Sequence, residues 1–263
     1  MLVRRILTAL FLCSPLGAIY WFFKETGLVA LCSISAFVIA YEYSFFIRRE
    51  ENIQQVFFIF LSFLFYIFFA FVSHSFLAFI FCFTILSFLF LTLTQQPVEK
   101  RILKLADWLM GIVYCGGLAG VVTVGILEYG SNFFMALFLV SFGTDTFAYV
   151  GGRLAGRTKL LPAISPNKTL EGSISGLAGG SILAIVFLHY QLPASNMVVV
   201  VSSCLFASCF SQIGDLFESL MKRYSGVKDS GTILPGHGGI LDRVDGLLFA
   251  APFLYLGFQY FSL

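Results

Sequence analysis

Long apolar blocks run along the whole chain, and short polar stretches separate them. A helix needs about 20 mostly apolar residues to cross the hydrocarbon core of a bilayer. Blocks of roughly that length predict an all-α, polytopic integral membrane protein with nine spanning helices. The predicted spans are 6–23, 28–47, 56–73, 76–94, 107–127, 132–151, 173–190, 197–217 and 244–262.

The basic residues give these helices an orientation. Lys and Arg accumulate in cytoplasmic loops, and with the amino terminus inside, every Lys and Arg except Lys24 falls on the inner side. This pattern predicts a cytoplasmic amino terminus and an external carboxyl terminus. The first block follows Arg4 and Arg5 as a signal peptide would, but no small-residue cleavage site comes after it, so we interpret it as a retained helix.

The composition points to the same lipid environment. Of the 263 residues, 59% are hydrophobic and 11% are charged, and the mean hydropathy is +0.92, whereas a soluble domain carries about 25% charged residues. These values exclude a soluble enzyme, a disordered tail and a secreted disulfide scaffold. The net charge of +2 gives no reason to expect a nucleic-acid partner. The six cysteines lie in apolar blocks without a CxxC pair, so we interpret them as packing residues.

The chain divides into two regions of different chemistry. Residues 1–105 are rich in Phe and hold four predicted spans, with charges mostly at span ends and Glu42 as the exception. Residues 106–263 hold five predicted spans and two long cytoplasmic loops, 152–172 and 218–243. Because these loops carry most of the remaining polarity, function is expected at the cytoplasmic face.

Carboxylates inside the later spans are the first sign of chemistry. A carboxylate at mid-helix costs about 2.5–3.5 kcal/mol on insertion scales, so such residues usually face a polar cavity. Asp145 in the sixth span is therefore expected to line a cavity, and a structural hydrogen bond or a buried ion pair is the alternative. The eighth span carries one polar stripe at three- and four-residue steps, made of Ser208, Ser211, Asp215, Glu218 and Lys222.

The ninth span opens with two carboxylates, Asp242 and Asp245, in its first turn. The helix dipole favours carboxylates there, so simple N-capping is the alternative interpretation. The eighth-span stripe ends at the same membrane face, which allows Asp215 and Asp242 to converge on one cation. Glu218 and Asp245 lie nearby as further ligands or supporting groups. Oxygen ligands without a His or Cys cluster favour a hard ion such as Mg²⁺, which substrate phosphates also coordinate.

The loop before the ninth span has the features of a phosphate cradle. Its glycines allow backbone amides to approach an anion closely, and basic side chains that bind phosphate frame it. These basic residues are Lys222, Arg223, Lys228 and Arg243. His237 in this loop is either a base or a turn residue, and the sequence leaves both readings open.

The entrance of the seventh span supplies a second basic group. Lys168 stands just before this helix, where backbone amides also favour an anion, and is a further phosphate contact. Along the span itself, Gly172, Gly176 and Gly180 share one face. Small residues at four-residue steps allow close packing of membrane helices, so we give this face a structural role.

From Ser219 to Asp245 the sequence reads SLMKRYSGVKDSGTILPGHGGILDRVD, which resembles the signature of phosphatidate cytidylyltransferases (CDP-diacylglycerol synthases). The segments 214–219, 165–172 and 145–149 are also similar to that family, whereas the first four spans match it only in hydrophobicity. The resemblance implies an integral nucleotidyltransferase that makes CDP-diacylglycerol and pyrophosphate from CTP and phosphatidate. It further implies dependence on Mg²⁺, a centre that can also hold a monovalent cation such as K⁺, and a homodimer.

The resemblance and the pattern together assign roles to individual residues. The groups expected to act in catalysis are Asp215, Asp242, Lys222, Arg223, Lys228, Asp229, His237, Arg243 and Asp245. The groups expected to bind substrate are Asn167, Lys168, Ser219, Gly238, Gly239 and Asp145. The metal ligands are expected to be Asp215 and Asp242, with Glu218 and Asp245 as additional candidates.

Two other classes of function use similar residues. A CTP-dependent lipid kinase would also need Mg²⁺ and basic loops, and a secondary transporter of an anion would also use carboxylates within spans. Short loops favour the plasma (inner) membrane of a bacterium. There, CTP would enter the cavity from the cytoplasm and the acyl chains would enter from the membrane lipid.

Overall fold

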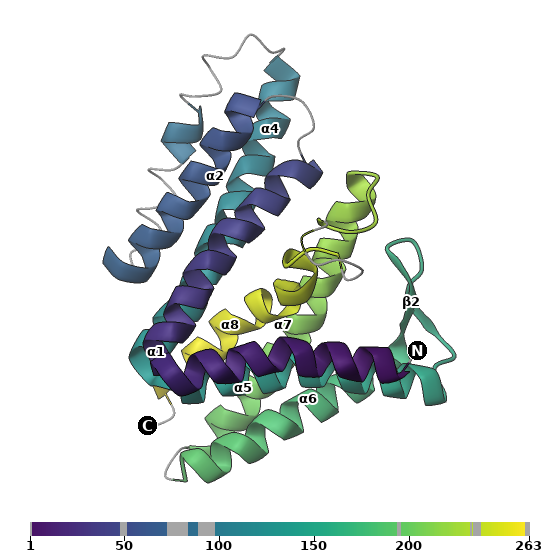
Figure 1. Ribbon diagram of the computed structural model, residues 1–263. Helices are drawn as coiled ribbons and strands as arrows, with labels where there is room; N and C mark the ends of the chain where they lie inside the picture. Colours follow the sequence, from purple (N-terminus) through teal and green to yellow (C-terminus); the bar gives the residue numbers. More distant parts are fainter. Residues whose placement is uncertain are drawn as a thin grey trace.

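The computed structural model describes residues 2–47, 52–72, 84–88, 98–193, 196–231, 233 and 238–260, and nearly all of this structure is helical (Figure 1). Within these residues, five segments are long and apolar enough to cross a membrane, which is the architecture of an all-α membrane protein. They are Tyr20–Phe45, Ile53–Val72, Arg101–Ala155, Leu170–Gln191 and Met197–Tyr224. The count of nine spans and the sides of the two termini remain predictions.

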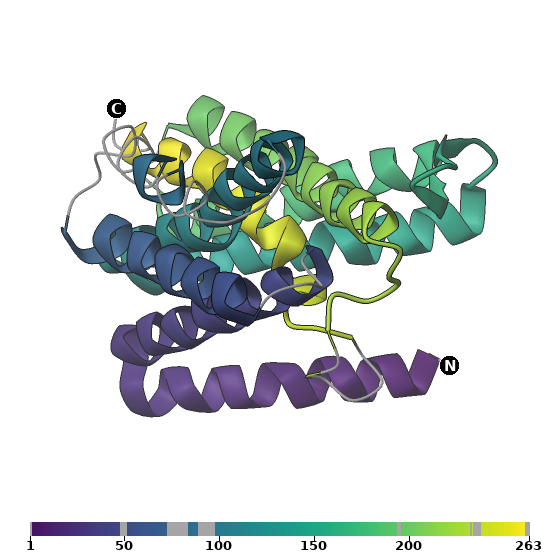
Figure 2. The same cartoon turned by 90° about the horizontal axis from the view of Figure 1, so that it is seen from above.

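The first helix, α1 (Leu2–Ile47), changes direction sharply at Lys24, whose φ is 49°. Its two halves therefore run in different directions, as Figure 2 shows most clearly. The break falls between the first and second predicted spans, so each of these spans is a helix. The turn is made by a single left-handed residue rather than by a loop.

Helix α2 (Asn52–Ile67) continues into a π-helical turn, η1 (Phe68–Val72), and together they cover the third predicted span. The fourth predicted span, 76–94, lies mostly outside the described residues.

A continuous helical run follows, made of α4 (Val98–Gly111), the π-helical η2 (Ile112–Leu118) and α5 (Ala119–Ala155). Gly130 interrupts α5 with a φ of 67°, a left-handed conformation that glycine adopts without steric cost. The helix on each side of this break corresponds to the fifth and the sixth predicted span, respectively.

A small antiparallel hairpin follows α5, formed by β1 (Lys159–Leu161) and β2 (Ser165–Thr169). Lys159 pairs with Thr169 in its register. The sequence analysis treated this stretch as an irregular loop, because its strands are too short and too polar to show an alternating pattern. The Thr169 side chain accepts a hydrogen bond from the amide of Gly172 and so caps the helix that follows.

The last three helices are α6 (Leu170–Gln191), α7 (Met197–Tyr224) and α8 (Leu241–Tyr260). They contain the seventh and eighth predicted spans and the ninth as far as Tyr260, beyond which residues 261 and 262 lie outside the described residues. Figure 1 shows α7 and α8 between the α5–α6 pair and helices α2 and α4, while the first half of α1 crosses in front of α5. Helix α7 continues past the predicted end of the eighth span at residue 217 to Tyr224, so residues 218–224 of the predicted loop 218–243 are helical. An ion pair between Glu218 and Lys222, one helical turn apart, joins these last turns.

The glycine face of α6 packs against α5, as predicted. Gly172, Gly176 and Gly180 are all buried. A Cβ added at Gly176 would lie 2.7 Å from the carbonyl oxygen of Thr144 on α5, so only glycine permits this approach of the two backbones. The close contact holds the hairpin, which joins these two helices, beside the end of α5.

Aromatic rings connect the first region to α7 and α8. Tyr114 on η2 lies edge-on to Phe217 of α7 and to Phe249 of α8, with ring centroids 5.2 and 5.6 Å apart. It also contacts Tyr43 of α1 at 6.2 Å. The two halves of the chain therefore share a core.

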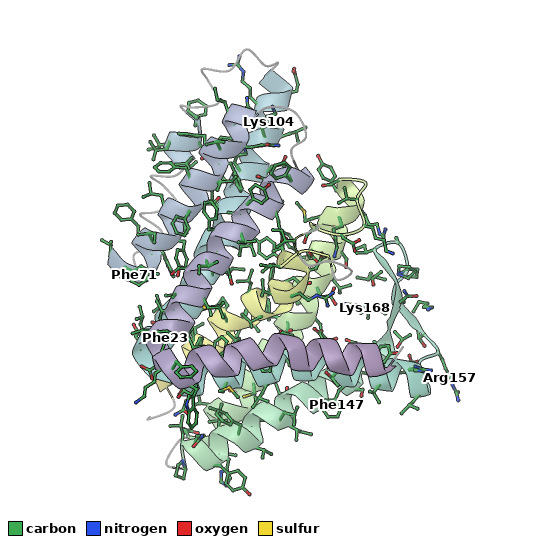
Figure 3. The ribbon with its side chains drawn as sticks, viewed as in Figure 1. Phe23, Phe71, Lys104, Phe147, Arg157 and Lys168 are labelled. Carbon is green, nitrogen blue, oxygen red and sulfur yellow. The ribbon has the colours of Figure 1, made fainter. Side chains whose placement is uncertain are left out.

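The outer surface carries large apolar side chains. Figure 3 labels Phe23, Phe71 and Phe147, which are 64%, 49% and 38% exposed. Exposed aromatic groups on this scale fit a surface in contact with acyl chains. Cysteines whose side chains are described are free, as expected for packing residues; they are Cys32, Cys115, Cys204 and Cys209.

Candidate active site

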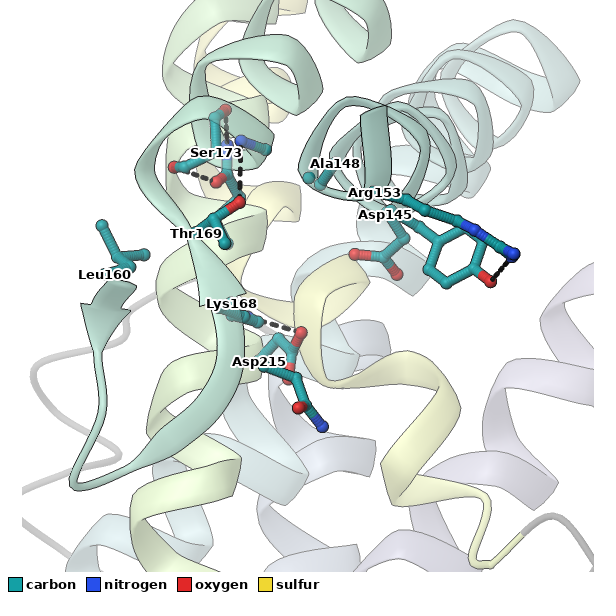
Figure 4. Close-up of a pocket in the computed structure, with 13 residues that line it drawn as sticks. Asp145, Ala148, Arg153, Leu160, Lys168, Thr169, Ser173 and Asp215 are labelled. Carbon is teal, nitrogen blue, oxygen red and sulfur yellow. Dashed lines mark hydrogen bonds and ion pairs between the residues drawn. The ribbon is translucent and has the colours of Figure 1, made fainter. Parts of the chain in front are cut away.

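A pocket of about 540 Å³ lies between the end of α5, the hairpin with the start of α6, and α7 (Figure 4). Four residues predicted to act at a site line it, namely Asp145, Asn167, Lys168 and Asp215. They come from three elements that are separate in sequence. The pocket forms where the glycine-packed α5–α6 pair meets the polar stripe of α7.

An ion pair crosses this pocket. The Nζ atom of Lys168 on β2 lies 2.6 Å from Oδ2 of Asp215 on α7, and the two side chains are 28% and 33% exposed. Asp145 on α5 faces the same space in Figure 4 and interacts electrostatically with both members of the pair. Two carboxylates and one ammonium group therefore share a solvent-accessible cavity, where an anionic ligand can contact the ammonium and a cation can contact the carboxylates.

The pocket also contains polar residues that the sequence analysis did not select. Arg153 lies one turn beyond Tyr149 on α5 and donates to its hydroxyl at 3.2 Å. Because Asp145, Tyr149 and Arg153 follow at four-residue steps, helical spacing could have placed them on one face. Arg153 was used only to orient the helices. Gln212 on α7 hydrogen-bonds both the side chain and the carbonyl oxygen of Ser173.

The amino-terminal part of the polar stripe on α7 has a structural role. The hydroxyls of Ser208 and Thr144 lie 2.6 Å apart, and those of Ser211 and Ser141 lie 3.2 Å apart. These buried contacts join α7 to α5. The charged residues of the stripe lie toward the carboxyl end of α7.

A second polar cluster lies at the carboxyl-terminal end of this stripe and centres on Lys222. Its Nζ atom lies 2.6 Å from Oε2 of Glu218 and 2.6 Å from Oδ1 of Asp242. Glu218 is 1% exposed. Lys222 therefore bridges the last turns of α7 to the first turn of α8. Its role as a phosphate contact stays a prediction.

Asp242 organises the loop that precedes α8. Its Oδ2 atom accepts hydrogen bonds from the amide and hydroxyl of Ser230, both at 2.9 Å, and from the amide of Gly239 at 2.8 Å. Burial raises the pKa of Asp242, but the hydrogen bonds from Lys222 and Gly239 outweigh it and hold the pKa at about 2. Both oxygens thus have donors, which are Lys222, Ser230 and Gly239 rather than amides of the first turn of α8. The role of Asp242 as a metal ligand stays a prediction.

Glu42 on α1 is a member of this cluster that the sequence analysis only noted as an exception. It is 1% exposed, and its carboxylate accepts hydrogen bonds from the amides of Ile240 and Leu241 at 3.0 and 2.8 Å. A charged residue within an apolar span was the available signal. The sequence pattern does not reveal its partners, because they lie almost at the other end of the chain.

Four carboxylates from α5, α7 and α8 form a set of oxygen donors that could hold Mg²⁺. Asp245 is 7% exposed and interacts electrostatically with Asp215, Glu218 and Asp145. The Oε1 atom of Glu218 is buried without a hydrogen-bond partner among the described residues. Within those same residues, no three side chains of the ligating types form a ready-made metal site. Carboxylates with an unpartnered oxygen suit Mg²⁺, which takes only one or two protein carboxylates and completes its shell with water and substrate phosphates.

The remaining predicted residues lie around the two groups. Arg223 donates to the carbonyl oxygen of Ile164 at 3.3 Å and so contacts the hairpin turn, and Ser219 donates to Asp215 at 3.5 Å. Gly238 has a φ of 81°, and a Cβ there would meet the Asp242 carboxylate. Lys228, Asp229 and Arg243 are exposed, as is Arg223. The prediction for His237 falls outside the described residues.

The chain is similar to a protein family along nearly its whole length and to individual relatives over half to two thirds of it. The model of a family described as "Cytidylyltransferase family" matches residues 3–261. The phosphatidate cytidylyltransferase of Staphylococcus haemolyticus (strain JCSC1435) is 42% identical over 176 residues, which are 64% of this chain and 65% of that protein. The Bacillus subtilis (strain 168) protein of the same name is 48% identical over 136 residues, 51% of this chain and 50% of that protein.

A third relative gives a similar result. The phosphatidate cytidylyltransferase of Staphylococcus aureus (strain COL) is 39% identical over 174 residues, 63% of this chain and 64% of that protein. The chain thus spans between half and two thirds of the length of these curated relatives.

Proposed function

The chain belongs to the cytidylyltransferase family, and on that premise we propose that it transfers a cytidylyl group from CTP to phosphatidate, giving CDP-diacylglycerol and pyrophosphate. The observation that carries the proposal is the pocket where Lys168 and Asp215 pair beside Asp145. This pocket lies within a segment that matches the family from residue 3 to residue 261. The substrate names come from the relatives, which are named phosphatidate cytidylyltransferase.

The chemistry requires little acid–base assistance from the protein. The second pKa of a phosphomonoester is about 6, so the phosphate of phosphatidate is largely a dianion at neutral pH. One of its oxygens forms a bond to the α-phosphorus of CTP, while the bond from that phosphorus to the oxygen bridging to the β-phosphate breaks. Pyrophosphate leaves with the electron pair. The main barrier is bringing two anions together and stabilising the charge that develops, which positioned cations do.

The basic side chains of the chain meet this requirement. Lys168 would exchange its contact with Asp215 for a phosphate oxygen when substrate enters, because both side chains are accessible to ligand. Arg153 would supply a second charge from the wall of the same pocket. Lys222, Arg223, Lys228 and Arg243 would hold the phosphates of CTP from the α7–α8 side, together with the amide of Gly238, while the amide of Gly239 stays bonded to Asp242. Asn167 and Ser219 would add neutral hydrogen bonds.

A divalent cation fits the carboxylates that surround these groups. Mg²⁺, when held by Asp215 with Asp242, Glu218 or Asp245, would neutralise charge on the triphosphate. The protein's part is to keep these carboxylates together at the ends of α7 and α8, against their mutual repulsion. Lys222 performs that part for Glu218 and Asp242, since it contacts both. A monovalent cation such as K⁺ belongs to the same proposal.

The setting of the reaction follows from the membrane character of the chain. We propose that the site faces the cytoplasm at the plasma membrane, that the chain has nine spans, and that it works as a homodimer. The positive-inside distribution of Lys and Arg supports the orientation. CTP would then reach the pocket from water, while the diacylglycerol part of phosphatidate stays among acyl chains.

Product analysis tests the proposal directly. Purified protein in detergent–lipid micelles would be incubated with phosphatidate and CTP labelled at the α-phosphate. The expected result is label in a lipid product together with release of unlabelled pyrophosphate. A lipid kinase would leave the label in CDP, and a transporter would leave CTP intact; either result would overturn the proposal.

A further inference from the structure

Glu42 connects the Phe-rich first region to the loop before α8. Its two carboxylate oxygens accept the amides of Ile240 and Leu241, and Leu241 is the first residue of α8. The first amides of a helix have no partner within the helix and must be satisfied from outside. Glu42 satisfies the first of them, that of Leu241, and also the amide of Ile240 just before the helix. Its negative charge is complementary to the positive end of the helix dipole.

The loop is fitted closely around this carboxylate. A Cβ added at Gly231 would lie 2.7 Å from Oε1 of Glu42, and one added at Gly239 would lie 2.5 Å from Oε2. Any side chain at either position would therefore push the loop away from Glu42. The two glycines let the backbone close on the carboxylate from both sides.

The same short stretch of loop also holds Asp242. The amide of Gly239 donates to Oδ2 of Asp242, while the next two amides donate to Glu42. Ser230 donates to Asp242 with both its amide and its hydroxyl. The loop is thus fixed between two carboxylates, one from each end of the chain, and Asp242 passes the constraint on to Lys222 through their 2.6 Å ion pair.

We propose that Glu42 is a positioning residue for cytidylyl transfer, which fixes residues 238–242 so that Asp242 and Lys222 meet the phosphates of CTP. The inference rests on the proposed function of the chain. With this role for Glu42, the first region contributes indirectly to the reaction, although its sequence carries no other candidate site residue. Glu42 touches no reacting atom and acts through the loop.

The kinetic test compares Glu42→Gln and Glu42→Ala in the purified full chain. The Gln variant keeps one acceptor and the Ala variant keeps none, so the defect should increase from Gln to Ala. We expect the KM for CTP to rise roughly tenfold in Glu42→Gln, the effect of losing one hydrogen bond to a charged group. The KM for phosphatidate should stay unchanged. A lower amount of folded protein would alter neither KM, so this difference separates positioning from a loss of stability.

Gln54→Ala is the matched control. Gln54 is also buried and polar in the first region, and it accepts a hydrogen bond from Lys104 at 3.0 Å. Its removal should lower thermal stability and leave the KM for CTP unchanged. An unchanged KM for CTP in both Glu42 variants, or an equal rise in Gln54→Ala, would overturn the inference.

Hydrogen exchange supplies a readout that does not depend on activity. The amides of Ile240 and Leu241 should exchange faster in Glu42→Ala than in the unaltered chain, with α6 unchanged as an internal reference. Unchanged exchange at these amides would also overturn the inference. If the unaltered chain makes no CDP-diacylglycerol, the proposed function fails, and the exchange result alone then decides whether Glu42 fixes the loop.

Discussion

Lys168 and Asp215 form a 2.6 Å ion pair between β2 and α7, and each side chain keeps about a third of its surface accessible. An exposed pair of this kind contributes little to stability, typically about 0–1 kcal/mol. Breaking the ion pair when a ligand binds therefore costs correspondingly little, since an incoming phosphate can replace the carboxylate as the partner of Lys168. The pair therefore keeps a basic group correctly oriented in the pocket without closing it.

Replacing Asp215 by Asn should abolish most activity while leaving the fold intact. The substitution removes a proposed Mg²⁺ ligand and the carboxylate that holds Lys168 in the pocket. Losing one group that supports the stabilisation of developing phosphate charge costs roughly 100- to 1,000-fold in turnover. Asp242→Asn should have a comparable effect, because its carboxylate bonds Lys222 and the loop. Initial rates with labelled CTP and phosphatidate would measure both variants. Glu99→Gln, at an exposed carboxylate in the first turn of α4, is the control; near-normal turnover in Asp215→Asn would contradict its assignment.

Removal of divalent cations should stop the reaction. Treatment with EDTA is expected to reduce CDP-diacylglycerol formation to background, and added Mg²⁺ should restore it, because the described residues of the site offer carboxylate oxygens as ligands. The measurement is the rate as a function of free Mg²⁺, with intact protein verified by size-exclusion chromatography after chelation. Full activity in EDTA would refute the proposed metal dependence.

Lys222→Met should destabilise the protein strongly, since Glu218 is fully buried and would lose its cation. Breaking a buried ion pair by removing one partner costs about 3–5 kcal/mol. The double variant Lys222→Met with Glu218→Gln should recover part of that loss. Thermal unfolding of the purified proteins in detergent would give the comparison. If the double variant is less stable than Lys222→Met, the two side chains do not depend on one another as the geometry indicates.

Gly176→Ala should loosen the packing of α6 against α5. The new methyl group would meet the carbonyl oxygen of Thr144 at 2.7 Å, and overpacking of this kind costs about 1–3 kcal/mol. Ala178→Val adds volume on an exposed position of the same helix and serves as the control. A thermal unfolding midpoint that is equal for Gly176→Ala and the unaltered chain would mean that the helices tolerate a wider separation.

The nine-span arrangement can be tested at the carboxyl terminus. A reporter fused after residue 263 should signal from the outer side of the membrane, because an odd number of spans separates it from a cytoplasmic amino terminus. A second reporter inserted at Gly226, in the loop after α7, should signal from the cytoplasm. A cytoplasmic signal from the carboxyl-terminal fusion would refute nine spans.

Much of the helical framework could be predicted because lipid imposes a simple rule on sequence. Every backbone group in hydrocarbon must be bonded within its own segment, so apolar blocks of sufficient length are helices. The glycine face of α6 follows from the same local reasoning. Lys222 could be linked to Glu218 from its four-residue spacing and to Asp242 from the meeting of two helix ends. In each case the partners are near in sequence, or the helix geometry brings them to one face.

Other features depend on contacts that local pattern does not carry. The hairpin of β1 and β2 is too short for an alternating pattern, and the last turns of α7 are polar enough to be read as a loop. Arg153 was assigned to membrane orientation, although it also lines the pocket. Glu42 was visible as an isolated charge, but its amide partners are determined by tertiary packing.

Glu42 and Ile240 are 198 residues apart in the chain, which affects when their contact can form during synthesis. At about 5–20 residues per second, a ribosome needs about 10–40 s to synthesise the intervening chain. Throughout that interval the Glu42 carboxylate is without the two amides that later enclose it. In the nascent chain, the Glu42 carboxylate therefore has to stay hydrated or protonated until α8 has been synthesised. Closure of this contact belongs to the final events of maturation.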